Sequence, residues 1–87
     1  MNYTVTWLAS AEQELAALWV DAVNRLAITT AAHQIEALLR KRPGQVGESR
    51  SKGFRILFVE PLAITFETSK LDQLVRVHHV WRSKSSS

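Results

Sequence analysis

The sequence changes character at one short segment, Arg40-Lys41-Arg42-Pro43-Gly44. Three cations followed by proline and glycine are typical of a helix end, because cations stabilise a helix C-terminus and proline cannot continue a helix. Before this segment the apolar residues recur at helical spacing. After it they fall into short runs that alternate as strands do. The chain is therefore expected to form its helices first and most of its sheet second.

Two helices are predicted in the first half of the chain. Residues 11–24 carry an apolar stripe, and Ser10 followed three residues later by Gln13 has the form of a capping box. A second helix carries its own stripe and ends in the cations of residues 40–42. The residues predicted to face the core are Leu15, Leu18, Trp19, Ala22 and Leu26 in the first pattern and Ile28, Ala31, Ala32, Ile35, Leu38 and Leu39 in the second.

Four strands are predicted, at residues 2–8, 54–60, 62–68 and 74–81. Pro61 marks a tight corner, and residues 69–73 form a short polar turn. The order β-α-α-β-β-β predicts an α+β domain in which a helical hairpin packs on one face of a four-stranded, mostly antiparallel sheet. The strand at 54–60 is expected to run antiparallel to the first strand, and the last three strands are expected to form a meander.

The size and composition of the chain limit its chemistry. With 87 residues it is expected to form one domain over residues 1–82, followed by a disordered serine-rich tail at 83–87. The absence of cysteine excludes disulfides, thiolate nucleophiles and Cys-ligated metals. No apolar run is long enough to span a membrane, and the first residues lack the features of a signal peptide. A cytoplasmic protein without a membrane partner is expected.

The charges gather on one face of the predicted sheet, although 11 basic against 8 acidic residues give a net charge of only +3. The alternation assigns Phe54, Ile56 and Phe58 to the face covered by helices. It assigns to the open face Arg55, Arg76, His78, Val80 and Arg82. Such a face predicts a phosphate-binding surface, because guanidinium groups pair with phosphate oxygens. The alternative is a face kept soluble by its charges, with Arg55 paired to Glu67.

The chain has three histidines, at positions 33, 78 and 79. His78 is a candidate general acid or base on the open face, although a strand histidine is more often structural. His79 and Trp81 are expected on the helix-covered face unless a bulge shifts the register. His33 lies on the second helix, so the spacing of the histidines predicts no metal site, and no cofactor is expected.

Four segments of the sequence together resemble the RelE/ParE superfamily of bacterial type II toxins. The resemblance spans nearly the whole chain, up to Arg82, and includes the element order. The segments are Tyr3-Thr4-Val5-Thr6-Trp7, Ala11-Glu12-Gln13-Glu14-Leu15, Gly47-Glu48-Ser49-Arg50 leading into Gly53-Phe54-Arg55-Ile56-Leu57-Phe58, and Val75-Arg76-Val77-His78-His79-Val80-Trp81-Arg82.

The resemblance implies a toxin that a cognate antitoxin protein neutralises. RelE-like members cut messenger RNA in the ribosomal A site, and ParE-like members inhibit DNA gyrase. For the RelE-like activity it implies Arg55 and Arg82 as catalytic residues, because they match basic residues of those nucleases. The predicted open face adds His78 as the catalytic residue that exchanges a proton. Arg50, Lys52 and Arg76 lie on or beside the same predicted face and are expected to hold the RNA backbone.

Two departures from the RelE-like pattern keep other functions open. The strand at 62–68 lacks the arginine of those nucleases, and the chain ends in serines without their C-terminal tyrosine. The leading hypothesis is ribosome-dependent cleavage of messenger RNA. The alternatives are a gyrase inhibitor of the ParE type and a decayed toxin that only binds its antitoxin. In each case an acidic antitoxin segment is expected to cover the basic face.

Overall fold

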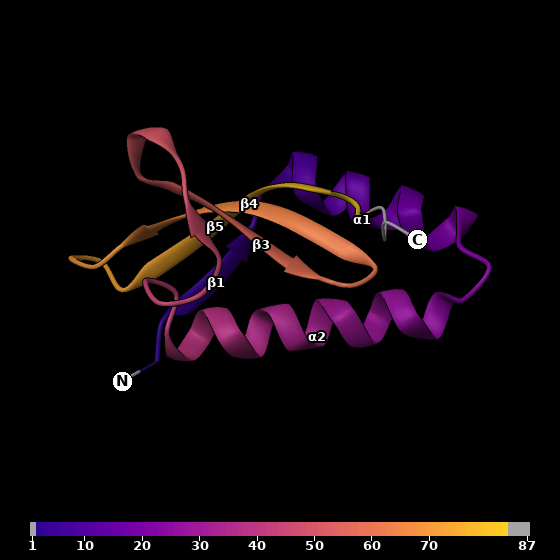
Figure 1. The fold of residues 1–87 in the computed structure, drawn as a ribbon, viewed down its shortest axis with the longest axis horizontal. Helices are drawn as coiled ribbons and strands as arrows, with labels where there is room; N and C mark the ends of the chain where they lie inside the picture. The colour runs from indigo at the N-terminus through magenta and orange to yellow at the C-terminus, as the bar shows by residue number, and fades with distance from the viewer. Residues whose placement is uncertain (1, 84–87) are drawn as a thin grey trace.

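The computed structural model describes residues 2–83. Its elements follow the predicted order, with one short strand and one 3-10 turn added (Figure 1). They are β1 (Thr4–Trp7), α1 (Ala9–Asp21), α2 (Arg25–Lys41), β2 (Glu48–Ser49), the 3-10 turn (Ser51–Gly53), β3 (Phe54–Val59), β4 (Leu62–Ser69) and β5 (Leu74–Arg82). None of the helices in the described part is long and apolar enough to cross a membrane.

The sheet has five strands in the order β1-β5-β4-β3-β2. β1 pairs with β5 in parallel, and the remaining pairs are antiparallel, so the predicted meander of β3, β4 and β5 is confirmed. β3 therefore runs in the same direction as β1, and the expectation that these strands are antiparallel is wrong. The reason is β2, which turns the chain back once more between α2 and β3.

The two helices form a hairpin that packs with the sheet around one core. The second apolar stripe is confirmed, because Ile28, Ala31, Ile35 and Leu39 of α2 are all buried. They meet Ala11 of α1 and a row of buried sheet residues, namely Leu57, Leu62, Ile64, Phe66, Val75, Val77 and Val80. In Figure 1 the connection between the helices lies at one end of the molecule and the β4–β5 turn lies at the other.

The first helix differs from its prediction at both ends. α1 begins at Ala9, so Ser10 lies inside the helix and no side chain caps its N-terminus; the predicted capping box is wrong. The helix ends at Asp21, and Asn24 instead caps α2, its Oδ1 accepting a hydrogen bond from the backbone N–H of Ala27 at 3.1 Å. Trp19 and Leu26 were predicted in the core and are exposed.

Side chains of α1 continue the hydrogen bonding of β5 beyond the end of β1. The backbone N–H of Leu8 donates to the carbonyl of Val77 at 3.0 Å, which is the last backbone bond along this edge. The Ser10 hydroxyl then donates to the carbonyl of His78 at 2.9 Å. The carboxylate of Glu14 accepts from the backbone N–H of Val80 at 3.0 Å. Helix α1 therefore satisfies strand groups that have no neighbouring strand.

A bulge in β5 changes the faces of its last residues. Phe66 lies opposite Val77 and Thr65 lies opposite His79, so His78 is an extra residue in the ladder. After the bulge Val80 turns into the core, and His79 and Trp81 are exposed. The assignment of Val80 to the open face and of His79 and Trp81 to the covered face is therefore wrong.

The faces of β3 are also the reverse of the prediction. Leu57 is buried at 7% exposure, whereas Phe58 is 53% exposed on the face that the helices leave open. Both faces of this strand carry apolar residues, so alternation alone does not distinguish them. Pairing decides the matter, because Leu57 lies opposite the buried Ile64 and Val59 lies opposite the buried Leu62.

The predicted tail begins at Ser83, whose backbone N–H donates to the carbonyl of Pro61 at 2.9 Å. This contact ties the end of β5 to the β3–β4 turn. The remaining residues of the predicted tail, 84–87, lie outside the described residues.

Candidate functional site

The open face of the sheet holds one histidine in a defined orientation. Nε2 of His78 lies 2.8 Å from Oε1 of Glu67, which projects from the adjacent strand β4. The ring of Phe54 on β3 meets the imidazole edge-on, with ring centroids 4.9 Å apart. The His78 side chain is 26% exposed. Residues of three strands thus fix the imidazole, and no hydrogen bond to its Nδ1 is made within residues 2–83.

Glu67 also faces the nearest arginine on this surface. Arg76 lies directly opposite Glu67 in the ladder, and its Nη1 is 3.9 Å from the same Oε1 that meets His78. One carboxylate therefore serves both a guanidinium and an imidazole. The local charge is close to balanced while His78 is neutral, which makes this face less cationic than the sequence suggests.

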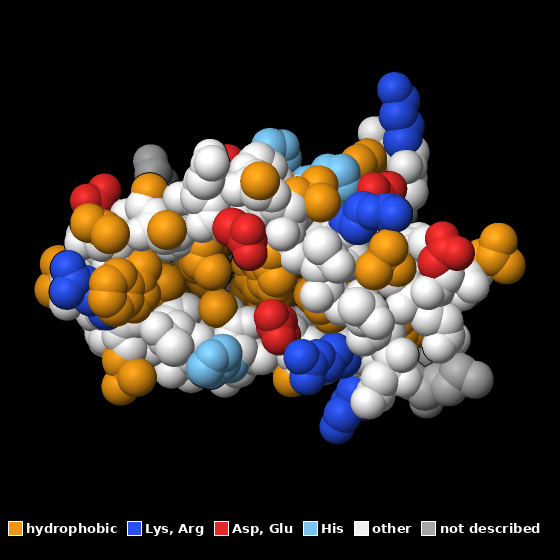
Figure 2. Space-filling model, turned by 180° about the vertical axis from the view of Figure 1, so that it is seen from behind, with side chains coloured by type: hydrophobic (Ala, Val, Ile, Leu, Met, Phe, Trp, Pro, Cys, Tyr) orange, Lys and Arg blue, Asp and Glu red, His pale blue; other side chains and the backbone are white. Residues whose placement is uncertain are grey.

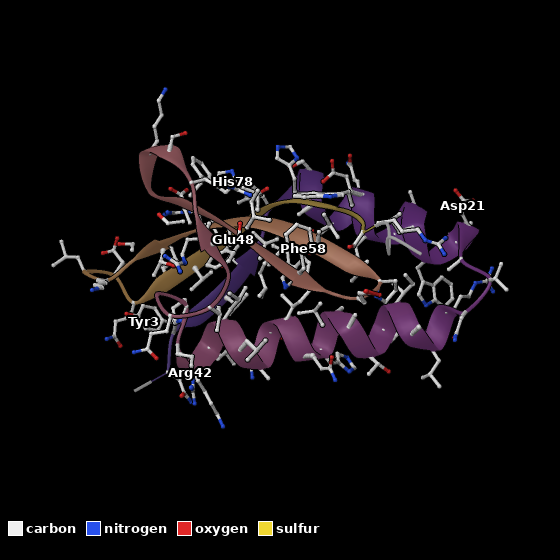
Figure 3. The ribbon with its side chains drawn as sticks, in the orientation of Figure 1. Tyr3, Asp21, Arg42, Glu48, Phe58 and His78 are labelled. Carbon is white, nitrogen blue, oxygen red and sulfur yellow. The ribbon has the colours of Figure 1, made fainter. Side chains whose placement is uncertain are left out.

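The two basic residues predicted near the start of β3 lie at the tip of the β2–β3 connection. Arg50 pairs with Glu48, their nearest atoms being 3.2 Å apart, and both side chains are exposed. Lys52 is exposed and has a φ of 61° in the 3-10 turn. Figure 3 labels Glu48 of β2, Phe58 of β3 and His78 of β5, which come from three different strands of the sheet.

Arg55 does not lie on the open face. Its Nε donates to the carbonyl of Val46 at 2.8 Å, and its Nη2 donates to the carbonyl of Gly47 at 3.1 Å. It shares the helix-covered side of β3 with Leu57, because residues two positions apart on a strand point to the same face. The expected position is therefore wrong, and the guanidinium holds the segment that follows α2.

Arg82 also lies away from His78, Glu67 and Arg76. It stands at the last position of β5, opposite Leu62, after the bulge has changed the register. It lies four positions after His78, or roughly 13 Å along an extended strand. The expected convergence of Arg55, His78 and Arg82 is therefore not observed.

Two features of this surface differ from the expectation based on the sequence. Glu67 was considered as a partner of Arg55, but its partners are His78 and Arg76. The open face also carries the apolar side chains of β3, with Phe58 the most exposed. The position of Glu67 can be read from the sequence, since it follows the apolar residues Ile64 and Phe66 in the alternation and so falls on the opposite face of the strand. The exchange of the buried and open faces of β3 cannot be read from the sequence, because both faces carry apolar residues.

A hollow of about 570 Å³ lies between the helices. Its walls include Leu15, Trp19, Ile28 and Ala32, and the indole of Trp7 donates to Glu36 at 3.0 Å beside it. Viewed from behind, hydrophobic side chains line a hollow that acidic side chains flank on both sides (Figure 2). Trp19 was predicted in the core and instead lines this hollow at 42% exposure.

Solved structures show what class of fold this arrangement belongs to, whereas no family model and no curated protein matches the chain. The toxin–antitoxin complex RelBE2 of Mycobacterium tuberculosis is similar with a TM-score of 0.77 at 15% identity, covering 94% of this chain and 99% of that one. The chromosomal ParDE system of P. aeruginosa is similar with a TM-score of 0.71 at 18% identity, covering 94% and 97%. A mutant of the E. coli toxin RelE in the free state gives 0.71 at 11% identity, covering 99% and 88%.

The chain therefore has the α+β fold of the RelE and ParE toxins, with two helices on a mixed five-stranded sheet. This confirms the fold inferred from the sequence, apart from the strand count. The similar structures include both RelE and ParE proteins, so the fold is common to two different activities implied by the sequence resemblance.

Proposed function

We propose that this protein is the toxin of a toxin–antitoxin pair and that its open sheet face acts on RNA. The fold supports the first part, since similar structures are toxin–antitoxin complexes and a free toxin. The His78–Glu67 pair supports the second part, because it presents an oriented imidazole beside a guanidinium on an exposed surface.

The proposed reaction is cleavage of messenger RNA by its own 2′-hydroxyl. The 2′-oxygen attacks the adjacent phosphorus, the bond from phosphorus to the 5′-oxygen breaks, and a cyclic phosphate forms. The 2′-hydroxyl loses a proton and the leaving 5′-oxygen gains one. His78 exchanges one of these protons through Nδ1, since Nε2 faces Glu67, and water exchanges the other. Arg76 pairs with the phosphate as its charge develops.

Glu67 is a positioning residue in this mechanism. Its carboxylate fixes the ring of His78 and stabilises the imidazolium that forms when the ring accepts a proton. Arg50 and Lys52 are proposed to contact the RNA backbone from the β2–β3 connection. Arg55 contributes only by holding residues 46 and 47, and Arg82 lies too far from His78 to share a phosphate with it.

Induced expression followed by mapping of messenger RNA ends tests this proposal. His78→Ala is expected to lower cleavage by about a hundredfold or more, as for the loss of a general acid or base. His79→Ala is the matched control, because His79 is the neighbouring exposed histidine and faces Glu14 instead. Intact transcripts in arrested cells would contradict the nuclease proposal.

A second candidate function is inhibition of DNA gyrase through protein binding. The observation that favours it is the apolar row of β3 on the open face, where Phe58 is 53% exposed, together with the near balance of charge around Glu67. Exposed aromatic residues are common anchors in protein interfaces. A supercoiling assay with purified components tests this candidate. Inhibition that Phe58→Ala relieves would support it, and full supercoiling at stoichiometric toxin would exclude it.

The proposed antitoxin partner covers the open face in either case. Arg50, Lys52 and Arg76 would meet its acidic residues, so we expect the complex to weaken as salt rises. An affinity that is equal at low and high salt would rule out charge masking. Expression without the antitoxin tests whether the protein is an active toxin or a decayed one, since a decayed toxin would not slow growth.

A further inference from the structure

A second hollow, of about 610 Å³, lies at the end of the molecule opposite the helix–helix connection. It is formed where the N-terminal side of β1, the end of α2 and the β4–β5 turn meet. Its lining includes Tyr3, Lys41, Arg42, Gln45 and Lys70. Figure 3 shows Tyr3 and Arg42 at this end, with Asp21 at the far one.

The cations of this hollow are not neutralised by the surrounding protein. Lys41, Arg42 and Lys70 are exposed and form no ion pair among residues 2–83. This contrasts with Arg40, which pairs with Glu36 one helical turn earlier at 3.3 Å. Cations at a helix C-terminus are expected from the helix dipole, which accounts for Lys41 and Arg42. It does not account for Lys70, which comes from a different part of the chain.

The three segments around the hollow are joined by backbone hydrogen bonds. The N–H of Tyr3 donates to the carbonyl of Arg40 at 2.8 Å, and the N–H of Thr4 donates to the carbonyl of Gln73 at 2.9 Å. The N–H of Gln45 donates to the carbonyl of Arg42 at 3.1 Å, and Pro43 beside it is buried. The convergence of the cations is therefore a property of the fold.

We propose that this hollow binds the phosphate backbone of RNA. Three unneutralised cations attract a polyanion, and the lining also includes Tyr3 and Gln45, whose hydroxyl and amide groups are hydrogen-bond donors. The C-terminal end of α2 presents backbone carbonyl groups, which repel an anion. An anion at this hollow is therefore bound by the charged ends of the Lys and Arg side chains. That geometry suits successive phosphates of a strand better than one small enclosed anion.

This inference rests on the proposed function, since the hollow adds a second contact for the RNA, but the hollow is separate from His78 and Glu67. Glu67 and Lys70 are three residues apart on and just after β4, or roughly 10 Å along the strand. A strand bound at Arg76 can therefore continue past the end of the sheet to Lys70. Binding at the hollow does not require cleavage, so it can be measured on the full chain carrying His78→Ala.

Fluorescence anisotropy with a short single-stranded RNA, measured across a series of salt concentrations, tests the proposal. Lys41→Gln and Lys70→Gln are each expected to weaken binding roughly three- to tenfold at low salt and to reduce the salt slope by about 0.7, the value for one phosphate contact on a single strand. Arg40→Gln is the matched control, since it removes the same charge from the same helix end but from a residue paired with Glu36. It is expected to change both quantities less.

Equal slopes for Lys41→Gln, Lys70→Gln and Arg40→Gln would overturn the proposal. A second measurement separates an RNA backbone from a free anion: the NMR signals of Tyr3 and Gln45 are followed during titration with the RNA and with inorganic phosphate. Shifts at micromolar RNA but not at millimolar phosphate support the proposal, and the reverse result overturns it. Loss of cleavage in His78→Ala with unchanged RNA binding separates this site from the proposed catalytic one.

Discussion

The backbone N–H of Val80 donates to the Glu14 carboxylate at 3.0 Å, which links α1 to the strand beyond its bulge. Ser10, one helical turn earlier, donates to the neighbouring carbonyl of His78 at 2.9 Å. The two side chains lie on one face of α1 because residues four apart share a face. The helix thus fixes the backbone on both sides of His79 and positions the candidate site without contributing a residue to it.

Glu14→Ala is expected to lower the free energy of unfolding by about 1–3 kcal/mol, because the N–H of Val80 loses its acceptor. Urea unfolding measures the change. Glu12→Ala is the control, since Glu12 is exposed on the same helix and makes no side-chain hydrogen bond within residues 2–83. Equal costs for the two variants would contradict the role assigned to Glu14.

Leu57→Ala and Phe58→Ala test the orientation of β3. Leu57 is 7% exposed and Phe58 is 53% exposed. Loss of a buried leucine typically costs about 2–5 kcal/mol, and truncation of the exposed phenylalanine is expected to cost much less. Thermal or urea unfolding of both variants gives the comparison. A larger loss for Phe58→Ala would restore the orientation predicted from the sequence.

Gly47→Ala is expected to destabilise the protein by more than about 1 kcal/mol. Gly47 has a φ of +74°, and a Cβ there would overlap the carbonyl oxygen of Ile56 on the adjacent strand. Gly44 is the matched control, because nothing lies near the Cβ position on its backbone. Denaturant midpoints of the two variants check this, and similar midpoints would argue against close contact between Gly47 and β3.

Arg55→Gln is expected to lower the unfolding free energy by about 1–3 kcal/mol, since the carbonyls of Val46 and Gly47 lose their charged donor. Arg82→Gln removes the same charge from an exposed strand end and is expected to leave stability within about 0.5 kcal/mol. Differential scanning calorimetry of the two variants measures this difference in stability. A stable Arg55→Gln variant that loses only activity would return Arg55 to the catalytic role expected from the resemblance.

Much of the fold follows from local patterns in the sequence. The α2 stripe of Ile28, Ala31, Ile35 and Leu39 is buried as predicted, because helical spacing defines one apolar face. The meander of β3 to β5 follows from short polar turns. The candidate site was predicted less well: His78 and Arg76 share the open face as expected, but Arg55 and Arg82 do not join them.

The sequence by itself determined the order of elements, the core face of α2 and the presence of a histidine and an arginine on one strand face. Only the tertiary structure decided which face of β3 is buried, because both of its faces carry apolar residues and pairing with Leu62 and Ile64 selects one. The bulge at His78 depends on the register between β4 and β5. The cations of the hollow meet because backbone hydrogen bonds join three segments that are distant along the chain.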